Sequence, residues 1–493
     1  MTAAQGCFGR SLMPRIVQTC ANGRATRGMT RVRLRTSTCG LMPFAEEHVA
    51  GKAIKFDRRR RPAGPRSSSV CCVSNTPRAA LVMSSAALEA VQDLVLRSKL
   101  AAPYELAGLF DGCARQFGAR GATAYLVDLQ QQQLVPLIDP AERADDDRAP
   151  ALSVDSTLAG RAFQTEHMQI GREGQDGQLL CWLPLQAGTN RLGVLGVTVS
   201  DPSAVETGSE LLCGLVRMAQ AAAELIVAKT PYGDTLVRLR RLAPLGLAAE
   251  LQYAILPPLS FTSRPVTVSA ALEPCYQVAG DAIDYAVDDG RARVAIFDGM
   301  GHGLHSAQCA VLTVVAYRNA RRCGLTLTET LASIDQALTD GLGGEVFTTA
   351  VLADLDTRTG LLQWVNAGHP APMLIRAGKL VRHLETVPRP PIGLGYLQPD
   401  EPLDVGVEQL EPGDLVLLYT DGVVEARSPG GEFFGAERLH ELVARHLAGG
   451  LAPPETMRRV VRELLDHHQG QLTDDATLLL LEWRNVRTDD DTC

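Results

Sequence analysis

Apolar and polar positions follow two different patterns in the first half of the chain. Where apolar residues recur about every 3.6 residues they predict helices, and where short apolar runs stand between polar turns they predict strands. A short helix over 156–167 is expected to begin with Ser156 as its N-cap. The other elements predicted here are helices over 86–99, 104–118 and about 206–229, and strands over 122–129, 130–138, 179–187 and 192–200.

From Val266 onward the pattern changes to many short strands with helices kept in separate stretches, which predicts an α+β sandwich. The predicted strands are 266–272, 282–289, 291–298, 349–356, 361–368, 372–378, 414–421 and 476–483, and the predicted helical stretches are 304–323, 327–341 and about 436–468.

Residues 230–257 join these two regions. Leucines recur every third or fourth position there, which predicts a helix interrupted at Pro244 and ending before Pro257. Packing between domains explains this linker, and so does a lever that transmits a signal; the sequence leaves both open.

Composition limits the class of protein. A chain of 493 residues, 45% apolar and 21% charged, indicates two to four globular domains. No run of 18 apolar residues occurs, so no membrane span is expected. The 12 cysteines include no CxxC pair, which argues against a zinc or disulfide framework and predicts a reducing cytoplasmic location.

Charge is unevenly distributed along the chain. Residues 1–80 carry 13 Arg, 2 Lys and 3 acidic residues, a net of +12, whereas the remainder has a net of −20. The acidic remainder does not favour nucleic acid. Met83 opens an amphipathic stretch, so we expect 1–83 to be a disordered Arg-rich segment or to precede the true start of translation. A nucleic-acid-binding arm is the alternative.

Four aspartates stand in separate motifs of the last 215 residues, most of them at the ends of apolar runs. They are Asp281 in QVAGDAIDY, Asp298 in VAIFDGMGHG, Asp421 in VLLYTDGVVEA and Asp474 in LTDDATLLLLEW. Each alone fits a turn residue, but four strand-end carboxylates together would repel one another without a cation. Carboxylate oxygens suit Mg²⁺ or Mn²⁺ rather than zinc, so these residues predict a site for such an ion that activates water.

These motifs, together with AAELQYAILPP and WVNAGHPAP, occur in an order that resembles the PPM (type 2C) metal-dependent Ser/Thr phosphatases, in their SpoIIE-like bacterial branch of actinobacterial type. The resemblance implies an α/β/β/α sandwich over 258–485 and two Mn²⁺ or Mg²⁺ ions. It implies that Asp298 bridges both ions and that the Gly299 carbonyl binds one. It also implies metal-ligand roles for Asp281, Asp421 and Asp474, with Asp475 as the alternative to Asp474.

Residues 86–229 resemble a GAF sensor domain, an antiparallel sheet with flanking helices, through AGRAF, CWLPL and RLGVLGV. This resemblance implies an unidentified small ligand or dimerisation. A homodimer through the helices at 206–255 is a further hypothesis, from their apolar stripe.

Two histidines lie near the aspartate motifs. Met300 stands where eukaryotic relatives have a general-acid His, so His302 is not expected to replace it, and the resemblance implies that solvent protonates the leaving serine. His369 in NAGHP either supports a turn or shapes the site. In the first region, a lone His167 fits a surface residue better than a haem ligand.

The resemblance implies a phosphoserine phosphatase that acts on a phosphorylated anti-anti-sigma (STAS-type) protein under control of the GAF domain. No nucleotide-binding glycine motif occurs, which fits a protein substrate. A catalytically weak regulator of the same fold is the alternative.

Overall fold

The computed structural model describes residues 85–139, 150–173, 178–200, 209–273, 280–301, 303–343, 346–394, 403–469, 472 and 474–484. All of them belong to one compact unit. The predictions for 1–83 and for His302 lie outside the described residues.

The first domain is a six-stranded antiparallel sheet with helices on both faces, as the sequence predicted. Its strand order is β3-β2-β1-β6-β5-β4. One face packs against α1, α2 and α4 around Phe110, Leu183 and Met218, and the other packs against α3 around Phe163. The elements are α1 Ser85–Ser98, η1 Pro103–Glu105, α2 Leu106–Gln116, β1 Gly121–Val127, β2 Gln133–Pro136, β3 Leu152–Ser153, α3 Leu158–Thr165, β4 Gln169–Glu173, β5 Gln178–Ala187, β6 Asn190–Val199 and α4 Glu210–Lys229.

Three details of this domain differ from the sequence predictions. Thr157, not Ser156, caps α3, and its hydroxyl accepts from the Gly160 amide at 3.0 Å. Strands β3 and β4 were not predicted, because one is only two residues long and the other is largely polar. Neither therefore shows the short apolar run by which a strand is recognised in sequence.

By length and composition, one described helical segment, Glu210–Tyr232, is apolar enough to cross a membrane. It contains α4, whose Leu215, Met218 and Ala222 are fully buried in the core of the first domain. A core helix meets the same test of length and composition.

The linker is broken where Pro244 predicted. It comprises η4 Thr230–Tyr232, α5 Thr235–Leu239 and α6 Leu247–Ile255. Leu236 of α5 belongs to the core of the first domain, whereas Ala248 of α6 packs on Ala307. Gln252 donates from Nε2 to the carbonyl of Asp281 at 2.7 Å. The two ends of the linker are thus built into different domains.

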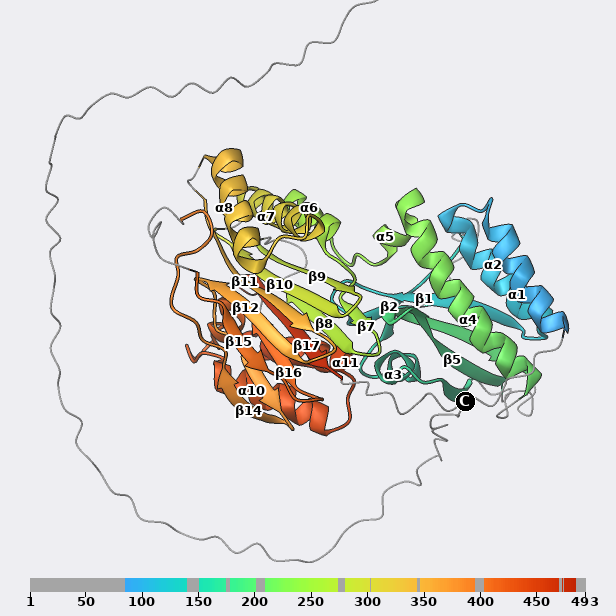
Figure 1. The fold of residues 1–493 in the computed structure, drawn as a ribbon. Coiled ribbons are helices and arrows are strands. Elements are labelled where there is room, and N and C mark those ends of the chain that lie inside the picture. The colour runs from blue at the N-terminus through green and yellow to red at the C-terminus, as the bar shows by residue number, and fades with distance from the viewer. Residues whose placement is uncertain are drawn as a thin grey trace, which may run out of the picture. The chain divides into compact units, whose positions relative to one another are not determined.

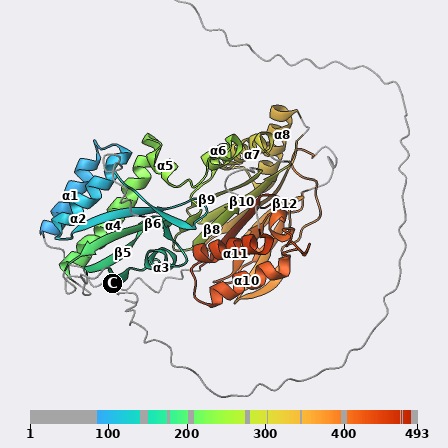
Figure 2. The same cartoon turned by 180° about the vertical axis from the view of Figure 1, so that it is seen from behind.

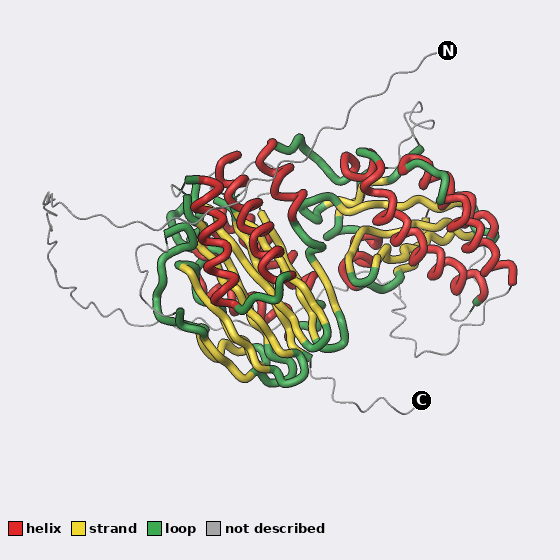
Figure 3. Tube along the Cα trace, turned by 45° about the horizontal axis from the view of Figure 1, so that its top comes forward, coloured by secondary structure: helices red, strands yellow, loops and turns green. Residues whose placement is uncertain are grey.

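The second domain is the predicted α/β/β/α sandwich. Its two sheets have the strand orders β15-β12-β11-β10-β9 and β14-β13-β16-β17-β8-β7 (Figure 1). Apolar side chains such as Ile296, Val351 and Leu479 fill the space between them. Helices α7 and α8 cover the first sheet, and α10 and α11 cover the second (Figure 2). Figure 3 shows both sheets as yellow layers between red helices.

The elements of this domain are β7 Ser260–Thr262, β8 Val266–Glu273, β9 Asp281–Asp288, β10 Arg291–Gly299, α7 Leu304–Arg322, α8 Leu327–Leu342, β11 Thr348–Asp356, β12 Leu361–Ala367, β13 Met373–Arg376, β14 Lys379–His383, β15 Gly406–Gln409, β16 Leu415–Tyr419, α9 Asp421–Val424, α10 Ala436–Ala448, α11 Pro453–His468 and β17 Ala476–Trp483. The helical stretch predicted over 436–468 is two helices, because Gly449-Gly450 follows α10 and Pro453 opens α11.

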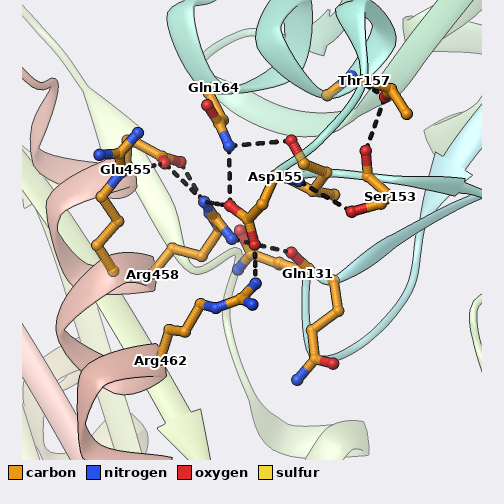
Figure 4. Close-up of polar contacts among 12 residues, drawn as sticks. Gln131, Ser153, Asp155, Thr157, Gln164, Glu455, Arg458 and Arg462 are labelled. Atoms are coloured by element: carbon orange, nitrogen blue, oxygen red, sulfur yellow. Dashed lines mark hydrogen bonds and ion pairs between the residues drawn. The ribbon is translucent and has the colours of Figure 1, made fainter. Parts of the chain in front are cut away.

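A buried ionic network connects the two domains at α11 (Figure 4). Glu455, fully buried, accepts from Arg458 at 2.8 and 2.9 Å and pairs with Arg191 of β6 at 3.2 Å. Arg458 also donates to Asp155 of the first domain at 2.7 Å, and Asp155 pairs with Arg462. Burial alone would raise the pKa of Glu455, but Arg458 and Arg191 hold that pKa below its ordinary value. The contact of α11 with the first domain therefore depends on buried ion pairs in which opposite charges balance.

Candidate functional site

Two aspartates face each other on neighbouring strands of the first sheet. Asp281 begins β9 and lies directly opposite Asp298 on β10. Side chains alternate along a strand, so these acids point to the same side as Ile283 and Ile296, which lie in the inter-sheet core. Two like charges in this arrangement disfavour folding unless something neutralises them.

The second sheet contributes three more acids at the same edge. Asp421 opens the one-turn helix α9 two residues after β16, and Asp474 and Asp475 immediately precede the neighbouring strand β17. The charges of these three carboxylates reach Asp298. Strand ends from both sheets thus converge on one acidic region.

Hydrogen bonds join the two sheets at this region. Thr420 donates from its hydroxyl to Asp281 Oδ2 at 2.9 Å. Asp475 Oδ2 accepts from the amides of Gly280 at 2.6 Å and Asp281 at 3.2 Å. Asp475 Oδ1 is buried and has no hydrogen-bond partner among the described residues. The carboxylates are therefore held in place while retaining acceptor capacity.

The acids have strongly perturbed pKa values. Burial, followed by the charges of Asp421, Asp474 and Asp475, raises the pKa of Asp298 to about 7. Burial also raises the pKa of Asp475 to about 6. The pKa of Asp281 lies well above its ordinary value, because of burial and the charges of Asp475 and Asp298. The protein alone does not compensate the negative charge gathered here.

The backbone around these acids is tightly packed. The Gly299 carbonyl accepts from Ser306 Oγ at 3.0 Å. A Cβ at Gly280 would lie 2.7 Å from that carbonyl oxygen, and one at Gly422 would lie 2.0 Å from the Asp475 carbonyl oxygen. Glycine at these positions permits the close approach of chain segments that carry the acids.

The structure thus brings all four predicted aspartates into one region. Within the part of the chain that the structure describes, however, no group of three or more His, Cys, Asp or Glu side chains is arranged so that it could share a metal ion. Asp475 is buried whereas Asp474 is exposed, a difference that the sequence does not show for two adjacent aspartates. Thr420 was missed as a contributor, and only its place beside Asp421 signals it, whereas the sequence analysis named Asp475 only as the alternative to Asp474.

The donor chemistry fits a hard divalent cation. The groups that converge are carboxylate oxygens and a backbone carbonyl, which Mg²⁺ and Mn²⁺ prefer. The buried Oδ1 of Asp475, which no described residue hydrogen-bonds, adds an acceptor that a cation would satisfy. The residues present are therefore compatible with the ions that the sequence predicted.

His369 lies next to this region but is held neutral. Its Nδ1 hydrogen-bonds to the Thr349 hydroxyl at 2.7 Å, and Asn366 binds its backbone amide and carbonyl. Burial lowers the pKa of His369 to about 3, so the ring does not act as an acid near neutral pH. Thr349 lies opposite Asp298 and hydrogen-bonds to its carboxylate. His369 therefore supports a turn and also touches the side chain that orients Asp298.

Thr349→Val is expected to weaken Mn²⁺ binding by about 10–100-fold, because valine keeps the size of threonine but removes the hydroxyl that holds Asp298. Calorimetric titration with Mn²⁺ measures this. Thr123→Val, at a part-buried strand position of the first domain, is the matched control and is expected to leave the affinity unchanged. Equal affinity of Thr349→Val and wild type would contradict the orienting role.

Gly422→Ala is expected to destabilise the fold by about 1–3 kcal/mol and to lower activity at least about tenfold, because the new methyl group displaces the backbone of Asp475. Denaturant unfolding and phosphatase assays measure the two effects. Gly112→Ala, on α2, meets nothing within 4 Å and is expected to leave both unchanged or to raise stability slightly. If Gly422→Ala and Gly112→Ala had the same stability and activity, the close approach of Gly422 to the Asp475 backbone would be rejected.

Comparison with known proteins supports a SpoIIE-type phosphatase domain in the C-terminal half. Residues 288–484 match the family model described as Stage II sporulation protein E (SpoIIE). The matched range contains Asp298, Asp421 and Asp474 and begins after Asp281.

Two curated relatives illustrate the similarity. The chain is 25% identical over 236 residues to the phosphoserine phosphatase RsbU of Bacillus subtilis (strain 168), covering 48% of this chain and 68% of RsbU. It is 30% identical over 140 residues to Protein IcfG of Synechocystis sp., covering 28% of this chain but only 21% of IcfG. The chain therefore spans about a fifth of IcfG and about two thirds of RsbU.

Among solved structures, the SiaA-PP2C domain of Pseudomonas aeruginosa is similar, with a TM-score of 0.40, 23% identity, and coverage of 52% of this chain and 98% of that one. The RsbU and RsbW domains of a Mycobacterium tuberculosis protein give a TM-score of 0.39 and 26% identity, covering 46% of this chain and 62% of that one. Since both scores are below 0.5, the description of the fold rests on the strand orders and layers given above.

Proposed function

We propose that this protein is a Mn²⁺- or Mg²⁺-dependent protein serine phosphatase whose substrate is a phosphoserine regulatory protein of the STAS anti-anti-sigma type. The observation that carries the proposal is the convergence of Asp281 and Asp298 from one sheet with Asp421, Asp474 and Asp475 from the other. Similarity to the phosphoserine phosphatase RsbU supports the reaction and the phosphoserine specificity.

In this proposal, Asp298, Asp281 and the Gly299 carbonyl would hold the ions from the first sheet, and Asp421 and Asp474 would hold them from the second. When bound, two divalent ions supply Lewis-acid chemistry that activates water at neutral pH and offsets charge on the phosphoryl oxygens.

Neighbouring side chains would then have supporting roles. Thr420 and Thr349 fix the carboxylates of Asp281 and Asp298. Neutral His369 supplies no proton, so protonation of the leaving serine is assigned to solvent. Asp475 holds the Gly280 segment against the second sheet through the amides of Gly280 and Asp281.

We propose that the first domain is a GAF-like sensor that controls the phosphatase. The α11 network and the linker helix α6 are physical connections between the domains. The proposed location is the cytoplasm, and four of the five described free cysteines are buried thiols, as in a reducing compartment. A homodimer through the helices of 206–255 remains a prediction.

Metal removal tests the proposed reaction. Dialysis against EDTA is expected to abolish phosphate release from p-nitrophenyl phosphate and from a phosphoserine STAS protein, and titration with Mn²⁺ or Mg²⁺ is expected to restore it. The same STAS protein phosphorylated on tyrosine is the control substrate and is expected to react far more slowly. Full activity in EDTA would contradict a metal-dependent enzyme. Metal binding without turnover on any substrate would favour the catalytically weak regulator.

A further inference from the structure

A cavity of about 340 Å³ lies in the first domain, where its sheet meets α4, α5 and the linker helix α6. Its apolar wall includes Leu126 and Leu192 from the sheet, Ile226 from α4 and Val237 from α5. Its volume lies within the range of small-molecule sites, and an apolar wall with a few polar groups is typical of them.

The polar feature of this cavity is Arg240, which also lines an adjoining cavity of about 290 Å³. Its Nε donates to the Val127 carbonyl at 2.9 Å, and its own carbonyl accepts from the Leu129 amide at 3.0 Å. The side chain is therefore fixed at the end of β1. Burial lowers the pKa of Arg240, with Tyr253 and Asp128 opposing that effect.

Neighbouring arginines form ion pairs with glutamates, whereas Arg240 forms none within the described part of the chain. Arg191 pairs with Glu455 at 3.2 Å, and Arg241 pairs with Glu250 at 2.6 Å. No carboxylate of the described residues forms an ion pair with Arg240. Asp128 acts on it from farther away, and the oxygens of Asp128 accept from three backbone amides, those of Gln130, Gln132 and Gln133. A part-buried guanidinium that has no ion-pair partner among the described residues attracts an anion.

We propose that this cavity binds a small amphipathic anion, a carboxylate or sulfonate with an apolar body, whose charged group pairs with Arg240 and whose body packs against Leu126, Leu192, Ile226 and Val237. The planar guanidinium presents two further nitrogens for a bidentate contact with such a group. The residues that line the cavity can pack against an apolar body. None of the described lining residues is a carboxylate that would bind a cation.

The location connects the ligand to the acidic region. Tyr253 of α6 lines the cavity, and the preceding residue, Gln252, is fully buried and donates to the Asp281 carbonyl at 2.7 Å. A ligand that shifts Tyr253 therefore acts on the same helix that holds Asp281. A change of phosphatase rate on ligand binding follows from this placement and rests on the proposed function, whereas the binding itself does not.

The test is calorimetric titration of the full chain with decanoate and with 1-decanol, which share a chain length but differ in charge. Decanoate is expected to bind saturably and at least tenfold more tightly than decanol. Arg240→Met is expected to weaken decanoate binding at least tenfold while changing decanol little. Arg238→Met, at an exposed position of α5 two residues before Arg240, is the matched control and is expected to bind as wild type does.

A second variant keeps the test decisive if Arg240→Met does not fold, which circular dichroism would reveal. Val237→Trp fills the apolar end without altering the arginine and is expected to abolish binding of both probes. The proposal is overturned if decanoate shows no saturable binding, if decanol binds equally well, or if decanoate binding survives both Arg240→Met and Val237→Trp. Since calorimetry does not measure phosphate release, failure here is distinct from failure of the proposed phosphatase activity.

Discussion

Asp298→Asn is expected to lower Mn²⁺-dependent phosphate release by at least about 10³-fold, since it removes a carboxylate that would hold the ions, a contribution of several kcal/mol to the barrier. Phosphate release from p-nitrophenyl phosphate, with Mn²⁺ titrated, measures this. Asp288→Asn, at the exposed end of β9, is the control and is expected to retain full activity. Full turnover by Asp298→Asn would reject the assigned site.

The same variant is expected to have the opposite effect on stability without metal. Folding raises the pKa of Asp298 from 3.8 to about 7, so ionisation of this group disfavours the folded state. That penalty grows as the pH rises above 3.8 and is complete above about pH 7. Asp298→Asn is therefore expected to raise the melting temperature of the EDTA-treated protein at pH 8, and less so at pH 5. A lower melting temperature at pH 8 would indicate that the carboxylate stabilises the fold.

Glu455→Gln is expected to destabilise the described unit by about 3 kcal/mol or more, because it leaves Arg191 and Arg458 buried without the charge that compensates them. Denaturant unfolding monitored by tryptophan fluorescence measures the loss. Asp466→Asn, at an exposed position of the same helix, is the matched control and is expected to change stability by less than about 0.5 kcal/mol.

Restoring charge balance provides a sharper test of this network. Combining Glu455→Gln with Arg191→Met removes one positive charge together with the negative one. The double variant is expected to be more stable than Glu455→Gln alone. Additive losses in the double variant would contradict the pairing between the two domains. Because α11 leads directly into the segment that carries Asp474 and Asp475, loosening of α11 is also expected to reduce phosphatase activity.

Much of the fold could be predicted from local sequence. The apolar runs that became β8, β10, β11, β12 and β17 are seven to nine residues long, and each is nearly complete in the prediction. Strands β7, β14 and β15 were missed, since they are three to five residues long and partly exposed. Such strands form because they hydrogen-bond to a neighbouring strand, and a local sequence pattern does not show which segments will be neighbours.

The acidic residues of the candidate site were also visible in the sequence, because each stands at the end of a buried apolar run beside a turn. Their partners were not. Thr349 resembles any strand threonine, and only the pairing of β10 with β11 places it opposite Asp298. Likewise, adjacent Asp474 and Asp475 differ only after the Gly280 segment packs against one of them.

Sequence alone determined the order of the longer strands and helices and the strand-end positions of four aspartates, because these follow from local periodicity and turn chemistry. The tertiary structure decided which carboxylate is buried, which hydroxyl groups orient the acids, and where charges meet between domains. Arg191 and Glu455 are 264 residues apart, and the proposed anion site at Arg240 depends on surrounding elements whose described residues supply no carboxylate for an ion pair. Burial and long-range pairing arise from packing, which residue order along the chain does not express.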